Sequence, residues 1–142
     1  MCSSDLISLL AMRKLCPCGK LDAKNQHLDY EACCGQYLDG VLLAPDAESL
    51  MRSRYSAYVL EKADYLISTW HSSQCPASLA FEPGVKWLGL QVQNHTVIDA
   101  LHAEVTFVAR RRDRTGRATR LHERSRFMCE NGRWYYVDGD NL

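Results

Sequence analysis

The chain has 142 residues, a length that suits one domain with its own core and a small appended module. Lysine plus arginine and aspartate plus glutamate both number 17, so the formal net charge at pH 7 is zero. Overall charge therefore attracts neither nucleic acid nor an anionic membrane. No apolar run reaches the roughly 20 residues of a membrane-spanning helix, so we expect no membrane contact.

Residues 1–14, MCSSDLISLLAMRK, contain an apolar patch that is followed by its basic pair. A secretory signal has the reverse order and ends at a small-residue cleavage site. We expect this leader to be disordered or helical, and to act as neither signal nor anchor. A cytoplasmic location then keeps the seven cysteines reduced, which argues against a disulfide framework.

Two cysteine pairs lie in a short segment, residues 15–40, within the phrases LCPCGK and ACCGQY. Proline fixes its own φ and Gly19 permits a positive φ, so both sulfurs of the first pair can point at one centre. The phrase DYEA predicts a short helical turn that presents the second pair to the first. Four thiolates would close a tetrahedral Zn²⁺ site, leaving no position for water, so the metal would be structural. The predicted ligands are Cys16, Cys18, Cys33 and Cys34.

Other arrangements of these thiols remain open. His27, between the two pairs, is a substitute ligand if Cys33 and Cys34 cannot both reach the metal. A metal-free arrangement would leave Cys33 and Cys34 free for thiol redox chemistry. The three remaining cysteines, at positions 2, 75 and 129, are scattered and expected to be inert.

CPCG followed by CCGQY resembles the SEC-C motif, a zinc knuckle at the tail of the bacterial preprotein translocase motor ATPase and in many small bacterial proteins. The resemblance implies that the same four cysteines bind zinc. It also implies a protein partner, because in the translocase motor the knuckle supports contact with a secretion chaperone. The stretch between the pairs, KLDAKNQHLDYEA, is longer here, and extra loop length costs little free energy.

Helices are predicted after the segment LDGVLLAPD, where Asp46 is a plausible N-cap. Apolar residues at steps of three and four predict helices over residues 46–61 and 62–70. A third short helix is expected over residues 77–81, between two prolines.

From Val85 onward the apolar period changes to two, which predicts antiparallel strands. The strand sequences are VKWLGLQVQNHTVID, LHAEVTFVARR, RLHERSRFMCE and GRWYYVDG, and RRRDRTGRATR is a long hairpin tip. Helices followed by a curved antiparallel sheet make an α+β fold. The predicted inward faces are Leu88, Leu90 and Val92; Leu101, Ala103, Val105, Phe107 and Ala109; and Leu121, Glu123, Ser125, Phe127 and Cys129.

The phrases MRSRYSAYVLEKADYLISTWH, WLGLQV and ERSRFMCENGRWYYVDG resemble the YchJ-like bacterial proteins, with similarity from about residue 15 to 138. Their middle part has the nuclear transport factor 2-like (NTF2-like, cystatin-like) cone of helices wrapped by a bent sheet. The resemblance implies an α+β cone over residues 41–142, preceded by the zinc knuckle of residues 15–40.

A cone of this kind encloses a pocket, and two residues are candidates for acid/base catalysis there. Glu123 points inward among apolar neighbours, where burial would raise its pKa and suit it to act as a base. The structural alternative is an ion pair of Glu123 with Arg52 or Arg54. His71 either lines the mouth of the cone or caps the second helix.

The edge between Arg110 and Arg126 holds eight arginines against two acids. Such a run is typical of a solvated edge that charge protects against strand pairing, and it could also bind an acidic protein or RNA. It lacks the interleaved aromatics that a nucleic-acid surface uses for stacking.

Taken together, the sequence predicts a zinc-containing binding or adaptor module that contacts another protein. The alternatives are a small enzyme, a hydrolase or isomerase that uses the cone pocket with Glu123 and His71, and a thiol redox protein.

Overall fold

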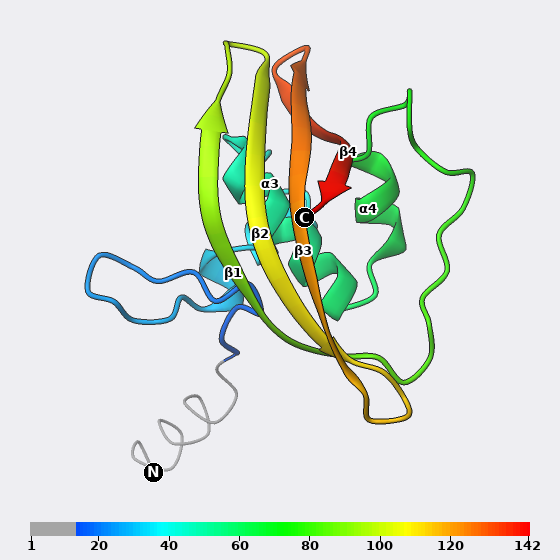
Figure 1. The fold of residues 1–142 in the computed structure, drawn as a ribbon. Helices are drawn as coiled ribbons and strands as arrows, with labels where there is room; N and C mark the ends of the chain where they lie inside the picture. The colour runs from blue at the N-terminus through cyan, green and yellow to red at the C-terminus, as the bar shows by residue number, and fades with distance from the viewer. Residues whose placement is uncertain (1–13) are drawn as a thin grey trace.

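The computed structural model describes residues 14–142, so the prediction for the leader lies almost wholly outside the described part (Figure 1). Helical segments precede a four-stranded antiparallel sheet of order β1-β2-β3-β4, which confirms the predicted α+β class. The elements are η1 (Tyr30–Ala32), α2 (Gly35–Leu38), α3 (Ala47–Val59), α4 (Ala63–Ser68), β1 (Lys86–Val97), β2 (His102–Arg112), β3 (Ala118–Glu130) and β4 (Arg133–Asn141).

The sheet bends around α3, and both α3 and α4 lie on the same side of it (Figure 1). Apolar side chains of β2 and β3 alternate inward and pack against α3, because successive residues of a strand point to opposite faces. This confirms the inner positions of both predicted faces, whereas Leu101, which precedes β2, and Leu121, near the start of β3, are exposed. The centre of this core contains Leu50, Tyr55, Val105, Phe107 and Phe127.

Strand β1 keeps Leu90 and Val92 on the predicted inward face, where they pack against the core, but Leu88 departs from that face. Register shifts interrupt its pairing with β2 between Trp87 and Gly89 and again between Val92 and Asn94. An extra residue at a bulge reverses the alternation that follows it. Leu88 is therefore outside and exposed, and Trp87 instead packs inward with its ring 5.6 Å from that of Tyr55.

The two main helices form where they were predicted. Asp46 caps α3 by accepting a hydrogen bond from the backbone N–H of Ser49 at 2.7 Å, as the sequence indicated. The third helix, expected over residues 77–81, is absent, and these residues belong to the long loop between α4 and β1. In this loop Phe81 packs edge-on against Tyr58 of α3, so a tertiary contact holds the segment although it forms no helix. No helix within residues 14–142 is long and apolar enough to cross a membrane.

Candidate metal centre and neighbouring cavity

The structure brings together the four cysteines that the sequence singled out. All four side chains are buried, and their sulfur atoms lie within 4.8 Å of one another. The Sγ atom of Cys18 is 3.6 Å from that of Cys16 and 3.6 Å from that of Cys33. Residues far apart in the knuckle, 15–40, thus form one compact sulfur cluster.

The first pair lies in the tight turn that CPCG predicts. The backbone N–H of Gly19 donates to the carbonyl of Cys16 at 3.2 Å, and Gly19 has a φ of 73°, which glycine adopts without strain. The chain then runs out and back, with isolated antiparallel β-bridges between Leu15 and Asp29 and between Leu21 and His27, and forms the loop that projects beside the sheet in Figure 1.

The second pair follows the predicted helical turn, which is η1. The backbone N–H of Cys33 donates to the carbonyl of Tyr30 at 3.0 Å, and Cys34 stands directly before α2. Gly35 has to be small here, because a Cβ atom at this position would lie 2.7 Å from the Tyr30 carbonyl oxygen and 2.9 Å from its ring. The glycine that follows Cys33 and Cys34 therefore allows this segment to pack closely against Tyr30.

The cysteine cluster is docked on α3. The Cys16 sulfur lies 3.7 Å from the hydroxyl of Ser56, and Arg52 donates from Nη1 to the carbonyl of Cys18 at 3.1 Å. The Nε of Arg52 is held by Glu48, one turn earlier on the helix, at 2.9 Å. The cysteines also pack into the same apolar core as Leu50. The knuckle and the sheet domain therefore share α3 as a common wall.

The spacing of the sulfur atoms fits a tetrahedral zinc ion. With zinc–sulfur bonds of about 2.3 Å, neighbouring sulfurs of a regular tetrahedron are about 3.8 Å apart. The observed 3.6 Å is close to this value and well beyond the bonded distance of a disulfide, about 2.05 Å. All four cysteines are free thiols. The donor set therefore fits a closed, four-thiolate structural site.

Hydrogen bonds among the four thiols favour a thiolate at Cys16 and disfavour one at Cys33 and Cys34. Hydrogen bonds with the other three thiols lower the pKa of Cys16, whereas hydrogen bonding with Cys16 is the largest cause that raises the pKa of Cys33 and of Cys34. The Cys16 thiolate thus accepts hydrogen bonds from the neighbouring thiols, and Cys33 and Cys34 keep their protons. Ionising all four together requires a positive charge at their centre, which a divalent metal supplies.

The other candidate ligands lie elsewhere. His27 is exposed on the projecting loop and is not part of the sulfur cluster. Cys75 and Cys129 are half-buried single thiols on the sheet domain, and Cys2 lies outside the described residues.

A cavity of about 380 Å³ lies between α3, the loop before β1 and the inner face of the sheet. Seven aromatic side chains line it, and Glu123 of β3 lies in its wall. The Glu123 carboxylate accepts a hydrogen bond from the hydroxyl of Ser125 at 2.6 Å. Sequence reasoning placed Glu123 inward correctly, because β3 keeps its alternation through this region.

The predicted ion pair of Glu123 with Arg52 or Arg54 is wrong. Arg52 binds Glu48 and the carbonyl of Cys18, and Arg54 binds the carbonyl of Leu66 together with Thr69. The pairing failed because both arginines find partners on or beside their own helix. The alternation of side chains along a strand indicates which face of the sheet a residue lies on, but it does not give the distance of that side chain from a helix.

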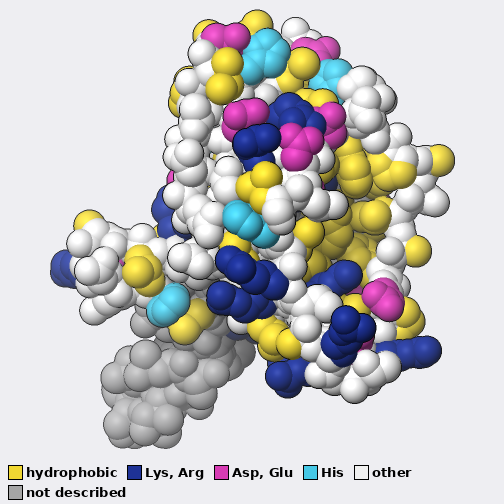
Figure 2. Space-filling model, viewed as in Figure 1, with side chains coloured by type: hydrophobic (Ala, Val, Ile, Leu, Met, Phe, Trp, Pro, Cys, Tyr) yellow, Lys and Arg dark blue, Asp and Glu magenta, His cyan; other side chains and the backbone are white. Residues whose placement is uncertain are grey.

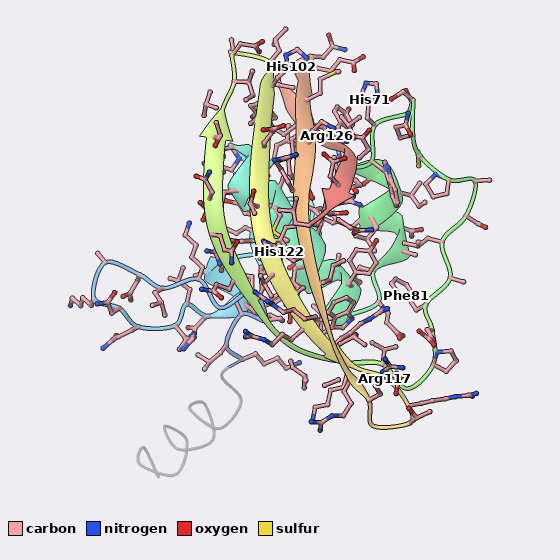
Figure 3. All side chains as sticks on the ribbon, viewed as in Figure 1. His71, Phe81, His102, Arg117, His122 and Arg126 are labelled. Carbon is pink, nitrogen blue, oxygen red and sulfur yellow. The ribbon has the colours of Figure 1, made fainter. Side chains whose placement is uncertain are left out.

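His71 is not near Glu123. It lies at the end of the sheet opposite Arg117 (Figure 3), where its Nε2 is 2.6 Å from a carboxylate oxygen of Glu130 and its Nδ1 is 2.7 Å from the hydroxyl of Ser73. It does not line the cavity, and α4 ends before it at Ser68, so it is neither a mouth residue nor a cap. The structure therefore does not assemble the expected acid/base pair.

The basic edge divides into two parts. At one end Arg126 binds Asp138 at 2.6 Å and Asp140 at 2.8 Å, and Arg124 also reaches Asp140, so β4 neutralises these arginines. Toward the hairpin tip, Arg110 and Arg120 stand opposite each other on neighbouring strands and are exposed. Figure 2 shows this division, with basic side chains gathered low on the face and mixed with acids above.

Sequence comparison finds relatives along most of the chain. A family model described as YchJ, middle NTF2-like domain, matches residues 46–139. A UPF0225 protein from a Polaromonas species is 62% identical over 127 residues, which cover 88% of this chain and 91% of the relative. A UPF0225 protein from Bordetella pertussis is 57% identical over 130 residues, with 88% and 91% covered.

Solved structures show the same architecture. The solution structure of a SEC-C motif containing protein from Rhodopseudomonas palustris matches with a TM-score of 0.78 and 32% identity, covering 90% of this chain and 98% of that one. The crystal structure of a SEC-C motif containing protein from Psychrobacter arcticus gives a TM-score of 0.74 and 33% identity, covering 92% and 83%. Both comparisons agree with the resemblances drawn from the sequence.

Proposed function

Since the chain belongs to the UPF0225 family and carries its YchJ-type NTF2-like domain, we propose that it is a zinc-stabilised binding module that contacts another protein. One observation carries the proposal, namely the four buried sulfurs within 4.8 Å of one another. Thiolates favour zinc over hard cations such as magnesium and calcium. Because four sulfurs fill the tetrahedron, the metal has no open position and its role is to hold structure.

The metal would fix the knuckle against α3 and so orient an exposed apolar segment. Val41, Leu42 and Leu43 follow the knuckle directly and are 75%, 50% and 59% exposed. Leu15 and Leu21 within the knuckle are exposed as well. Apolar side chains gathered in the open are typical of protein-binding surfaces. We therefore assign the partner contact to the knuckle and to residues 41–43.

This assignment fits better than the alternatives. An enzyme that uses the cavity with Glu123 and His71 as its acid/base pair would need both groups there, and His71 does not line the cavity. A redox role for Cys33 and Cys34 would expel the metal on oxidation, because a disulfide removes two thiolate ligands. The thiolate site also favours a reducing compartment such as the cytoplasm.

The zinc content tests the metal centre. Protein purified without added metal is measured by elemental mass spectrometry as wild type, Cys33→Ser and Cys75→Ser. We expect about one equivalent of zinc in the wild type, a large loss in Cys33→Ser, and no change in Cys75→Ser, whose thiol lies outside the cluster. A wild type free of zinc, with Cys33 and Cys34 readily alkylated, would favour the redox alternative.

The partner contact is tested by cross-linking and quantitative mass spectrometry on a bacterial extract. The variant Val41→Asp/Leu43→Asp removes the apolar segment, and Val97→Asp/Ile98→Asp, where β1 ends in the hairpin to β2, is the matched control with similar exposure. A protein captured by wild type and control but lost in the first variant supports the assignment. Equal loss in both variants, or in neither, contradicts it.

A further inference from the structure

Arg54, in the middle of α3, is a buried cation without an acidic partner. Its side chain is 6% exposed, and within residues 14–142 no carboxylate lies at ion-pair distance from it. Its Nη1 donates to the carbonyl of Leu66 at 2.8 Å and to the hydroxyl of Thr69 at 2.7 Å. Burial lowers the pKa of Arg54. A buried charge is costly unless something offsets its desolvation.

Two aromatic rings and the end of α4 supply part of this compensation. The guanidinium carbon is 4.6 Å from the centre of the Tyr136 ring and 5.1 Å from that of Trp70. These contacts and the bonds at Nη1 fix the direction of the guanidinium plane. They also occupy only one of its three nitrogens with hydrogen bonds.

The other two nitrogens, Nε and Nη2, make no hydrogen bond within residues 14–142. In the described part of the chain, every fully buried side-chain nitrogen or oxygen has a hydrogen-bond partner. The Nε and Nη2 atoms of Arg54 have none, so they retain accessible surface, and the opening that Arg54 lines is the cavity of about 380 Å³. Together Nε and Nη2 form the side of the guanidinium that binds a carboxylate through two parallel hydrogen bonds.

The rest of the cavity fits an aromatic body. Tyr55, Tyr58 and Trp87 form one wall from α3 and β1, with ring centres of the contacting pairs 5.6 Å and 5.9 Å apart. Phe81 closes another side from the loop before β1 (Figure 3), packing edge-on against Tyr58. Aromatic walls with a few placed polar groups are typical of small-molecule sites of this volume.

Acidic groups also border the cavity, and they limit the ligand to one negative charge. Glu123 is turned toward β4, where a Cβ atom on Gly139 would lie 2.6 Å from the Glu123 carboxyl carbon. Glu61 and Glu82 line the cavity as well, and Arg111 stacks over Trp87 in the same wall. A second anionic group on the ligand would meet these carboxylates.

We propose that this cavity binds a small aromatic monocarboxylic acid, whose carboxylate pairs with Nε and Nη2 of Arg54 and whose ring packs among the aromatic walls. This site is separate from the metal centre and from the partner contact, and it does not depend on either of them.

The test compares 3-(4-hydroxyphenyl)propionate with its primary amide by calorimetry and by NMR on the wild-type protein. The two probes differ in charge and share their ring, so the comparison does not depend on any variant folding. We expect the acid to bind at least about tenfold more tightly than the amide, the factor expected for a charge-assisted bidentate pair over a neutral one. Shifts should appear at the Arg54 Nε–H and the Trp87 indole N–H signals.

Variants then test whether Arg54 is the cation that selects the acid over the amide. Arg54→Met should remove the preference for the acid, and Arg54→Lys should reduce it, because an ammonium lacks the fork. Arg110→Gln and Arg120→Gln are the controls and should retain the preference, because these arginines are exposed and do not line the cavity. Equal binding of acid and amide, binding of neither, or shifts confined to the outer arginines Arg110 and Arg120 would each overturn the proposal.

Discussion

Replacing Gly35 by alanine tests whether close packing under Tyr30 positions the second cysteine pair. The new Cβ atom would lie 2.7 Å from the Tyr30 carbonyl oxygen and 2.9 Å and 3.0 Å from two of its ring carbons. The carbonyl cannot recede freely, because it accepts the backbone N–H of Cys33 at 3.0 Å. Relief of the clash must therefore move either the turn or the thiols.

Two opposing effects set the size of the change. Overpacking of this kind costs about 1–3 kcal/mol, whereas alanine gains at most about 1 kcal/mol over glycine through helix propensity in α2. Because the clash is against a backbone atom, the cost of overpacking exceeds the gain in helix propensity. We expect a net loss of about 1 kcal/mol in the free energy of unfolding, seen as a melting temperature lower by several degrees.

Thermal unfolding and zinc release to a competing chelator are the two assays. Gly35→Ala should lower the melting temperature and speed zinc release. Gly40→Ala is the matched control, since Gly40 has a φ of 77° and no atom lies within 4 Å of the point that its Cβ would occupy, so the substitution strains the backbone without touching Tyr30. It should destabilise by about 1–2 kcal/mol and leave zinc release unchanged. A higher melting temperature for Gly35→Ala, with unchanged zinc release, would refute the packing argument.

Two further predictions concern the sheet domain. Leu66→Ala should lower the free energy of unfolding by about 2–5 kcal/mol in urea titrations, because Leu66 is fully buried, whereas Leu60→Ala, at a 41% exposed site, should change it by only about 0.5 kcal/mol. Hydrogen bonds from Arg126 and then Arg124 hold the pKa of Asp140 below its usual value. This pair therefore stabilises the fold above the usual aspartate pKa and loses its effect as the pH falls through the depressed value. In Arg126→Gln, NMR titration should show a higher pKa for Asp140, and the stability gap to wild type should close in acid; an unchanged Asp140 pKa would contradict the pairing.

Local chemistry made the four-cysteine cluster predictable from the sequence. Proline and Gly19 restrict the CPCG turn, and a helical turn follows naturally from DYEA, so the sulfurs of each pair had few other directions to take. The helix over residues 47–59 and the inward faces of β2 and β3 were predictable for a similar reason, since each depends on a regular period and a local cap. Each of these features can be predicted from residue spacing within one element or from a local turn or cap.

Only the tertiary structure decided the features that depend on distant partners. The bulge that moves Leu88 outward and Trp87 inward is a property of the register between β1 and β2, which no single strand specifies. Arg54 faces the cavity because Leu66 and Thr69 hold one side of its guanidinium, and Glu123 turns toward β4 because Gly139 leaves room there. The sequence by itself determined which four cysteines come together, the order of the elements and most of their faces. The partners of its inward-facing charges were set by tertiary packing, which brings the end of α4 beside Arg54 and leaves the Glu123 carboxylate to accept from the hydroxyl of Ser125.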